Sequence, residues 1–165
     1  MTIALAIAKL ATLLPSADAS PQPALRRVYS DPAEAVNVAD MPSIVMGLSA
    51  IQPERYTEEA LGLMRHDYTI ALWLFLGFRQ TPLPELHSRA LPWSLAITTV
   101  LAANLTLGGV VNQLGPGSFD QPLITFRAGP INWGFDGNGA PLVYWGLTGQ
   151  LPIVEKHNLT MGAGS

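Results

Sequence analysis

The sequence predicts a single α+β domain in which an antiparallel β-sheet, mainly a meander, packs against two main helices. Three observations lead to this class. Apolar residues alternate with a period of two over much of the chain, while two segments have the spacing of helices. The length of 165 residues is about that of one domain, and no internal repeat divides it. We therefore treat residues 1–165 as one domain, with a helix over 1–14 and a linker over 16–23.

The N-terminal segment is almost entirely apolar and predicts a buried helix. Its apolar side chains recur at helical spacing, at Ile3, Ile7, Leu10 and Leu14. Pro15 and the Ser-rich run that follows end the pattern. A cleavable secretion signal is the alternative, but such a signal carries its positive charge before an unbroken apolar core. Here Lys9 interrupts the apolar stretch and no Lys or Arg precedes it, so we expect a helix of the folded domain.

Residues 25–29 and 43–46 predict short strands, because β-branched or aromatic residues there adjoin proline-containing turn signals. The polar, Glu-rich residues 51–64 predict a loop or a short turn of helix. The clearest strand is 68–75, whose sequence YTIALWLF is apolar on both faces. A strand that is apolar on both faces is covered on both. We therefore expect helices over one face and allow for a neighbouring subunit over the other.

Residues 84–104 predict the main helix. Pro84 and Glu85 suit its first turn, whereas Pro92 predicts a kink or a division into two helices. The stretch 90–111 contains 22 residues without a charge, which is long enough to cross a bilayer. It also contains several polar residues and lacks a flanking cluster of Lys and Arg, so a helix buried in protein is the better interpretation.

From residue 123 onward the pattern is that of a meander. Strands are predicted over 123–127, 131–133, 141–145 and 151–159. The sequence Asp-Gly-Asn-Gly at 136–139 is a strong turn signal, since these residues tolerate a positive φ. The pair Thr148-Gly149 predicts another turn.

The composition excludes several classes of protein. Apolar residues make up 48% of the chain and charged residues only 13%, about half of the usual ~25%, so the chain is not disordered. The net charge of −3 does not suit a dedicated nucleic-acid-binding surface. Without cysteine there is no disulfide framework, thiolate zinc site or cysteine nucleophile. A domain this apolar commonly hides surface against partner subunits or a membrane.

Motifs that carry chemistry are scarce. The sequence has no phosphate-binding glycine loop, nucleophile elbow or HExxH pair, and we predict no catalytic, cofactor-binding or metal-binding residues and no cofactor. Glu155 and His157 lie two apart on a predicted strand and therefore share a face, for which an exposed ion pair is the simpler interpretation. A small hydrolase remains an alternative if His66, Asp67 or His157 converge on a pocket.

The aromatic residues are the best candidates for contacts between subunits. They are more numerous than the core of so small a domain needs, and aromatic side chains are enriched at interfaces. The candidate interface residues are Trp73, Phe75, Phe78, Trp93, Trp133 and Phe135.

The order of these elements resembles the tail terminator (tail completion) proteins of long-tailed bacteriophages, the lambda-like group and related prophages and gene-transfer particles. The resemblance covers about residues 25–159 and rests on pattern rather than on an invariant motif. Its segments are RVYSDP at 27–32, ADMPSIV at 39–45, YTIALWLF at 68–75, LHSRA at 86–90 with Leu101, LGGVV at 107–111, YWGLT at 144–148 and LPIVEK at 151–156. The longer N-terminal segment, the loop 112–121 and the glycine-containing tail depart from the family pattern.

The resemblance implies a structural virion protein and not an enzyme. Members of the family form a hexameric ring that caps the head-proximal end of the tail tube, ends its polymerisation and joins the tail to the head–tail connector. The implied partners are copies of the chain itself, the tail tube protein and the connector or adaptor protein. DNA only passes through the lumen, and no membrane is involved. The implied location is the virion, after assembly in the host cytoplasm.

A ring closed by cyclic symmetry buries two different patches on every subunit, which agrees with an unusually apolar chain. The nearest alternatives are other neck or tail ring proteins, namely a tail tube subunit or a head-completion adaptor. A tube subunit generally has a long loop toward the next ring, and the short segment 112–121 is the sole candidate for one. A membrane-associated protein, which would partition into detergent, is the remaining alternative.

Overall fold

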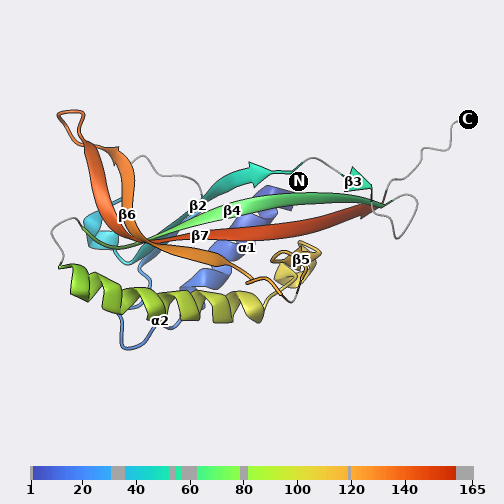
Figure 1. Ribbon diagram of the computed structural model, residues 1–165, viewed down its shortest axis with the longest axis horizontal. Coiled ribbons are helices and arrows are strands. Elements are labelled where there is room, and N and C mark those ends of the chain that lie inside the picture. The colour runs from blue at the N-terminus through green and yellow to red at the C-terminus, as the bar shows by residue number, and fades with distance from the viewer. Residues whose placement is uncertain are drawn as a thin grey trace, which may run out of the picture.

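The computed structural model describes residues 2–30, 36–52, 55–56, 63–78, 82–118 and 120–158. Two α-helices and a β-sheet make up the α+β fold that the sequence predicts (Figure 1). The helices are α1 (Thr2–Leu13) and α2 (Leu83–Ala102). The strands are β1 (Arg27–Tyr29), β2 (Ser43–Ile51), β3 (Arg55–Tyr56), β4 (Leu63–Phe78), β5 (Gln113–Leu114), β6 (Thr125–Phe135) and β7 (Pro141–Asn158). Short 3₁₀ turns lie at Leu14–Ser16, Val38–Asp40 and Leu107–Gly109.

The strands form one sheet in the order β1-β2-β4-β7-β5, with β3 beside β4 and β6 beside β7. All neighbours are antiparallel except β1 and β2, which run parallel. The sheet is therefore mixed rather than wholly antiparallel. The sequence predicted a loop or a helical turn at 51–64. This was wrong for residues 55–56, which form β3 and pair with β4. Residues 53–54 and 57–62 lie outside the described residues.

The long ladder between β4 and β7 is the centre of the sheet. It runs from Leu63 opposite Asn158 to Phe78 opposite Tyr144. The predicted turn at Thr148-Gly149 is wrong, because β7 continues through both residues and pairs there with β4 on one side and β6 on the other. Pairing on both sides outweighs the local turn tendency. The part of the predicted strand 151–159 beyond Asn158 lies outside the described residues.

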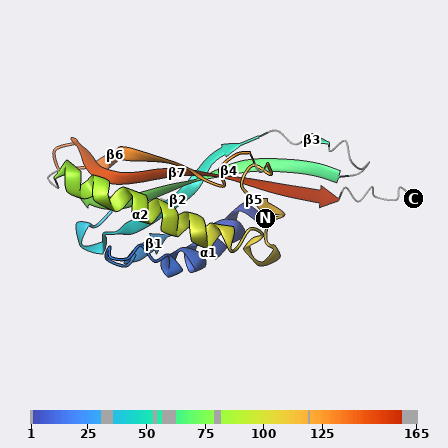
Figure 2. The same ribbon diagram turned by 60° about the horizontal axis from the view of Figure 1, so that its bottom comes forward.

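Both helices lie on the same face of the sheet, as the two views show (Figures 1 and 2). The predicted N-terminal helix is confirmed. It buries Ala6 and Leu10 in the main core, and Leu14 follows in the adjoining 3₁₀ turn. α2 continues through Pro92 as one helix, so the predicted division does not occur. The sheet contributes alternate residues of β4 and β7 to this core, namely Tyr68, Ile70, Leu72, Leu74, Leu147, Leu151 and Ile153.

The opposite face of β4 is covered by other parts of the same chain. Its centre is a second cluster of buried side chains, Val36, Val45, Phe75, Ile131 and Tyr144. Phe75 packs edge-to-face against Tyr144 and against Trp133, with ring centroids 5.3 and 5.7 Å apart. The Tyr144 hydroxyl donates a hydrogen bond of 3.0 Å to the carbonyl oxygen of Val36. Since the β6–β7 hairpin covers this face, no neighbouring subunit is needed to bury the apolar strand.

Candidate interaction surface

The structure separates the six aromatic interface candidates into three groups. Phe75 and Trp93 are 0% and 1% exposed within the chain's own core, so assigning them to an interface was wrong. Trp73, Phe78 and Trp133 are partly buried against the second cluster. Phe135 is 73% exposed and stands at the end of β6. It is therefore the one member of the set that reaches well into solvent.

Phe135 lies at the tip of the β6–β7 hairpin, which bends away from the rest of the sheet (Figure 1). The tip is held by Asp136, whose Oδ1 accepts the backbone N–H groups of Asn138 and Ala140 at 2.8 and 2.9 Å. Gly139 has a φ of +78°, which a glycine adopts readily. The turn predicted at 136–139 is therefore confirmed, and the exposed Phe135 directly precedes it in the chain.

The outer face of α2 exposes a second group of apolar side chains. Leu91 and Leu95, one helical turn apart, are 65% and 59% exposed, while Trp93 between them faces the core. A groove of about 490 Å³ runs beside these leucines and is bounded on its other side by residues 16–20. Exposed leucines one turn apart make an apolar stripe that the chain itself leaves uncovered.

The far end of β2 exposes a third group. β1 pairs only with residues 43–45 of β2, and within the described part of the chain no strand lies beside 46–51 on that side. Leu48 and Ile51 are exposed on this part of the strand. In Figure 1 β2 lies along the upper side of the molecule and α2 along the lower side. The apolar groups thus lie on different faces.

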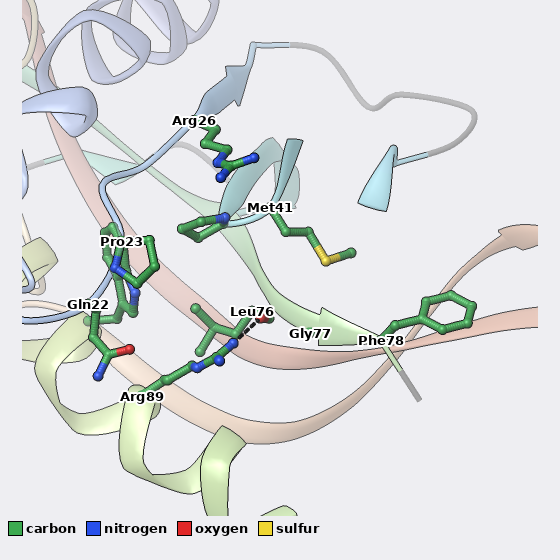
Figure 3. Close-up of a pocket in the computed structure, with 10 residues that line it drawn as sticks. Gln22, Pro23, Arg26, Met41, Leu76, Gly77, Phe78 and Arg89 are labelled. Carbon is green, nitrogen blue, oxygen red and sulfur yellow. Dashed lines mark hydrogen bonds between the residues drawn. The ribbon is translucent and has the colours of Figure 1, made fainter. Parts of the chain in front are cut away.

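A pocket of about 220 Å³ lies between α2, the segment 22–26, the residues just before β2 and the end of β4 (Figure 3). Met41, Leu76 and Trp93 supply apolar lining. Arg26 and Arg89 lie on opposite sides of it. The Arg89 guanidinium donates from Nη1 to the carbonyl oxygen of Leu76 at 3.2 Å and also pairs with Glu85. Arg26 donates from Nη1 to the carbonyl oxygen of Ala39 at 2.9 Å, which holds its guanidinium beside the pocket.

A buried polar pair lies far from this pocket along the β4–β7 ladder. The Tyr68 hydroxyl donates a 2.8 Å hydrogen bond to Oε1 of Glu155, which is only 3% exposed. His66 stands opposite Glu155 in the ladder, and its ring meets that of Tyr68 edge-on at 5.9 Å. Burial, followed by the hydrogen bond from the hydroxyl to Glu155, raises the pKa of Tyr68 far above its ordinary value. The Tyr68 hydroxyl thus keeps its proton, and its hydrogen bond to Glu155 joins two central strands.

Of the residues considered for a hydrolase, the structure describes the side chains of His66 and Asp67, and these two point to opposite faces of β4. His66 and Asp67 are neighbours on β4, and successive side chains of a strand point to opposite faces. His66 faces Tyr68, while Asp67 pairs with Nε of Arg65 at 2.8 Å. The side chain of His157 lies outside the described residues. Among the described residues no three or more His, Asp or Glu side chains are grouped so as to hold a metal ion.

No protein-family model matches the chain, and no curated protein matches it. In the described part of the chain, neither helix has the length and apolar character needed to span a membrane.

Replacing Tyr68 with Phe is expected to make the free energy of unfolding fall less steeply as the pH rises above about 10. Because the pKa of Tyr68 is raised from 10 on folding, the folded chain keeps a proton that the unfolded chain releases. This contribution is fully present below about pH 10 and is lost as the pH rises toward the folded-state pKa, at about 1.4 kcal/mol per pH unit. Burial also raises the pKa of Tyr144, so the Tyr68→Phe variant keeps part of the slope.

Urea unfolding at a series of pH values on both sides of pH 10 measures this difference. At neutral pH the variant should be less stable by about 1–3 kcal/mol, because the hydrogen bond to Glu155 is lost. If the free energies of unfolding of the wild type and the variant fell in parallel throughout the alkaline range, proton release by Tyr68 would not be coupled to folding.

Proposed function

We propose that the chain is a tail terminator of a long-tailed bacteriophage, a structural subunit that closes a hexameric ring with its own copies. In this role the ring caps the head-proximal end of the tail tube and ends its polymerisation. Its partners are the tail tube protein and the head–tail connector, and DNA passes through the lumen. The order of helices and strands along the chain supports this role through the family resemblance of residues 25–159.

The observation that carries the proposal is the exposure of apolar side chains on separate faces of one small domain. Leu91 and Leu95 lie on the outer side of α2, whereas Leu48 and Ile51 lie at the far end of β2. A dimer about a two-fold axis needs one self-complementary patch, but a closed ring needs two different patches on each subunit. Separate uncovered apolar groups therefore favour a head-to-tail ring over an isolated domain or a simple dimer.

Immunogold labelling of particles tests the location directly. Antibodies against the purified chain, carried on gold, are applied to phage particles from the organism that encodes it. One gold cluster at the junction of head and tail is expected. Label along the whole tail would identify a tube subunit instead, and label on the head alone would contradict a role in the tail.

Replacing both Leu91 and Leu95 with Glu is expected to prevent ring assembly. Both side chains are already exposed, so the charges cost the folded monomer little, but they would be buried without a partner in a subunit contact. Sedimentation velocity and negative-stain imaging measure the loss of rings, and circular dichroism checks the fold. The matched control Ala8→Glu places a charge on the exposed side of α1. Rings of normal size from the double variant would remove the outer face of α2 from the proposed interface.

A further inference from the structure

We infer that the hairpin tip of one copy, Phe135 with Asp136, inserts into the Arg26–Arg89 pocket of the next copy. The inference rests on the proposed ring in one respect, because it takes a second copy of this chain as the occupant. It goes further by assigning both halves of the contact to named side chains.

The tip has the features of an anchor that a partner buries. Phe135 is more exposed than any other large apolar side chain in the described part of the chain. The turn that follows Phe135 is held by four hydrogen bonds between Asp136 and residues 138–140, so the ring is presented on a fixed support. Little conformational entropy is then lost on binding, and aromatic anchors of this kind contribute most to interface affinity.

The pocket is the size of a side chain rather than of a drug-like ligand. Its volume of about 220 Å³ lies below the ~300–1,000 Å³ that is usual for sites of small molecules. Met41 and Phe78, which are only partly buried, offer an apolar and aromatic lining to an inserted ring, above the buried Leu76 and Trp93. Such a pocket matches one phenylalanine.

The charges of the two halves are complementary. The hydrogen bonds within the turn use Oδ1 of Asp136, and a carboxylate accepts at both oxygens. At the pocket, the bond from Arg26 to Ala39 uses one of the five N–H donors of a guanidinium. An arginine that lines the pocket and an aspartate that follows the inserted phenylalanine in the chain would orient the contact, as opposite charges do at interfaces.

The direction of the hairpin makes a second copy the partner. In Figure 1 the tip points away from α2, and α2 forms one wall of the pocket through Arg89 and Trp93. The tip of a chain therefore does not fill its own pocket. A contact in which one surface of each copy meets a different surface of the next is heterologous, and repeated with cyclic symmetry it closes a ring.

Mixing two variants with different defects tests the contact. The tip variant carries Phe135→Ser and Asp136→Asn, and Asn keeps an acceptor for the turn. The pocket variant carries Arg26→Glu. Each variant alone should associate at least about tenfold more weakly than the wild type, as expected for a lost anchor. An equimolar mixture should give dimers and no larger species, because only the tip of the pocket variant and the pocket of the tip variant are intact.

Light scattering and sedimentation velocity measure the sizes of the species in the mixture, and circular dichroism checks that both variants are folded. If the tip variant and the pocket variant each assembled as the wild type does, the inference would be overturned, but the proposed ring would stand. A mixture that stays monomeric, or that forms full rings, would overturn it as well.

Cysteine cross-linking gives an independent readout, because the chain contains no cysteine. A variant with Asn138→Cys at the tip and Gln22→Cys at the pocket should form a ladder of disulfide-linked oligomers. The control pairs Asn138→Cys with Ala8→Cys on the exposed side of α1 and should stay unlinked. No ladder, or equal ladders from both pairs, would overturn the inference. A specific ladder without gold label at the head–tail junction would keep the contact and reject the tail terminator role.

Discussion

A chain with alanine at position 146 is expected to lose a large share of its stability. Gly146 lies in β7, and a Cβ atom there would overlap the carbonyl oxygen of Leu74 in β4. That oxygen belongs to the backbone of the central ladder, so it cannot move without separating the two strands. Overpacking a core typically costs about 1–3 kcal/mol, and a clash with backbone lies at or above the upper end. This is a large share of a typical total of about 5–15 kcal/mol.

Urea or thermal unfolding of the purified Gly146→Ala variant measures the loss. The matched control is Gly137→Ala in the hairpin turn, where an added Cβ meets no atom within 4 Å and φ is not positive. We expect the control to stay within about 0.5 kcal/mol of the wild type. If both variants unfolded at the same midpoint as the wild type, the close approach of β7 to Leu74 would be wrong.

Replacing Leu10 with alanine is expected to destabilise the chain by about 2–5 kcal/mol, the usual cost of removing a buried leucine side chain. Leu10 is 0% exposed and packs into the main core from α1. Denaturant unfolding followed by circular dichroism measures the change. The N-terminal helix therefore contributes to the stability of the whole domain.

The same helix supplies the control. Leu5 is 57% exposed, so Leu5→Ala should change the stability by no more than about 0.5 kcal/mol. Equal effects of the two substitutions would mean that α1 has no fixed buried side. A loss of helix signal without a change in the unfolding midpoint would mean that it folds apart from the sheet.

The sequence predicted elements whose signals are local and missed those that depend on distant pairing. The periodicity of residues 3–14 and the turn residues at 136–139 need only their neighbours, and both elements form as predicted. Thr148-Gly149 has the residues of a turn, but β4 and β6 hold it in a strand from both sides. Pro92 lies inside a continuous helix. Such outcomes depend on contacts that no local pattern contains.

The candidate surface was predicted in part. Phe135 was among the aromatic candidates, and its place directly before a turn signal could have marked it as exposed. Phe75 and Trp93 were misassigned because an apolar residue that faces the chain's own hairpin or sheet cannot be told from one that faces a partner. The pocket could not be predicted, since Arg26, Met41, Leu76 and Arg89 meet only through the packing of four separate segments.

The ladder between β4 and β7 joins strands that are separated by residues 79–140. During synthesis β4 therefore leaves the ribosome after α1 and β2 but long before β7, its main partner, and before α2. Pairing over so long a separation is slow, and unpaired apolar strands bind one another. We therefore expect a holding chaperone, or a low temperature, to raise the yield of folded chain by protecting β4 until β7 has been made.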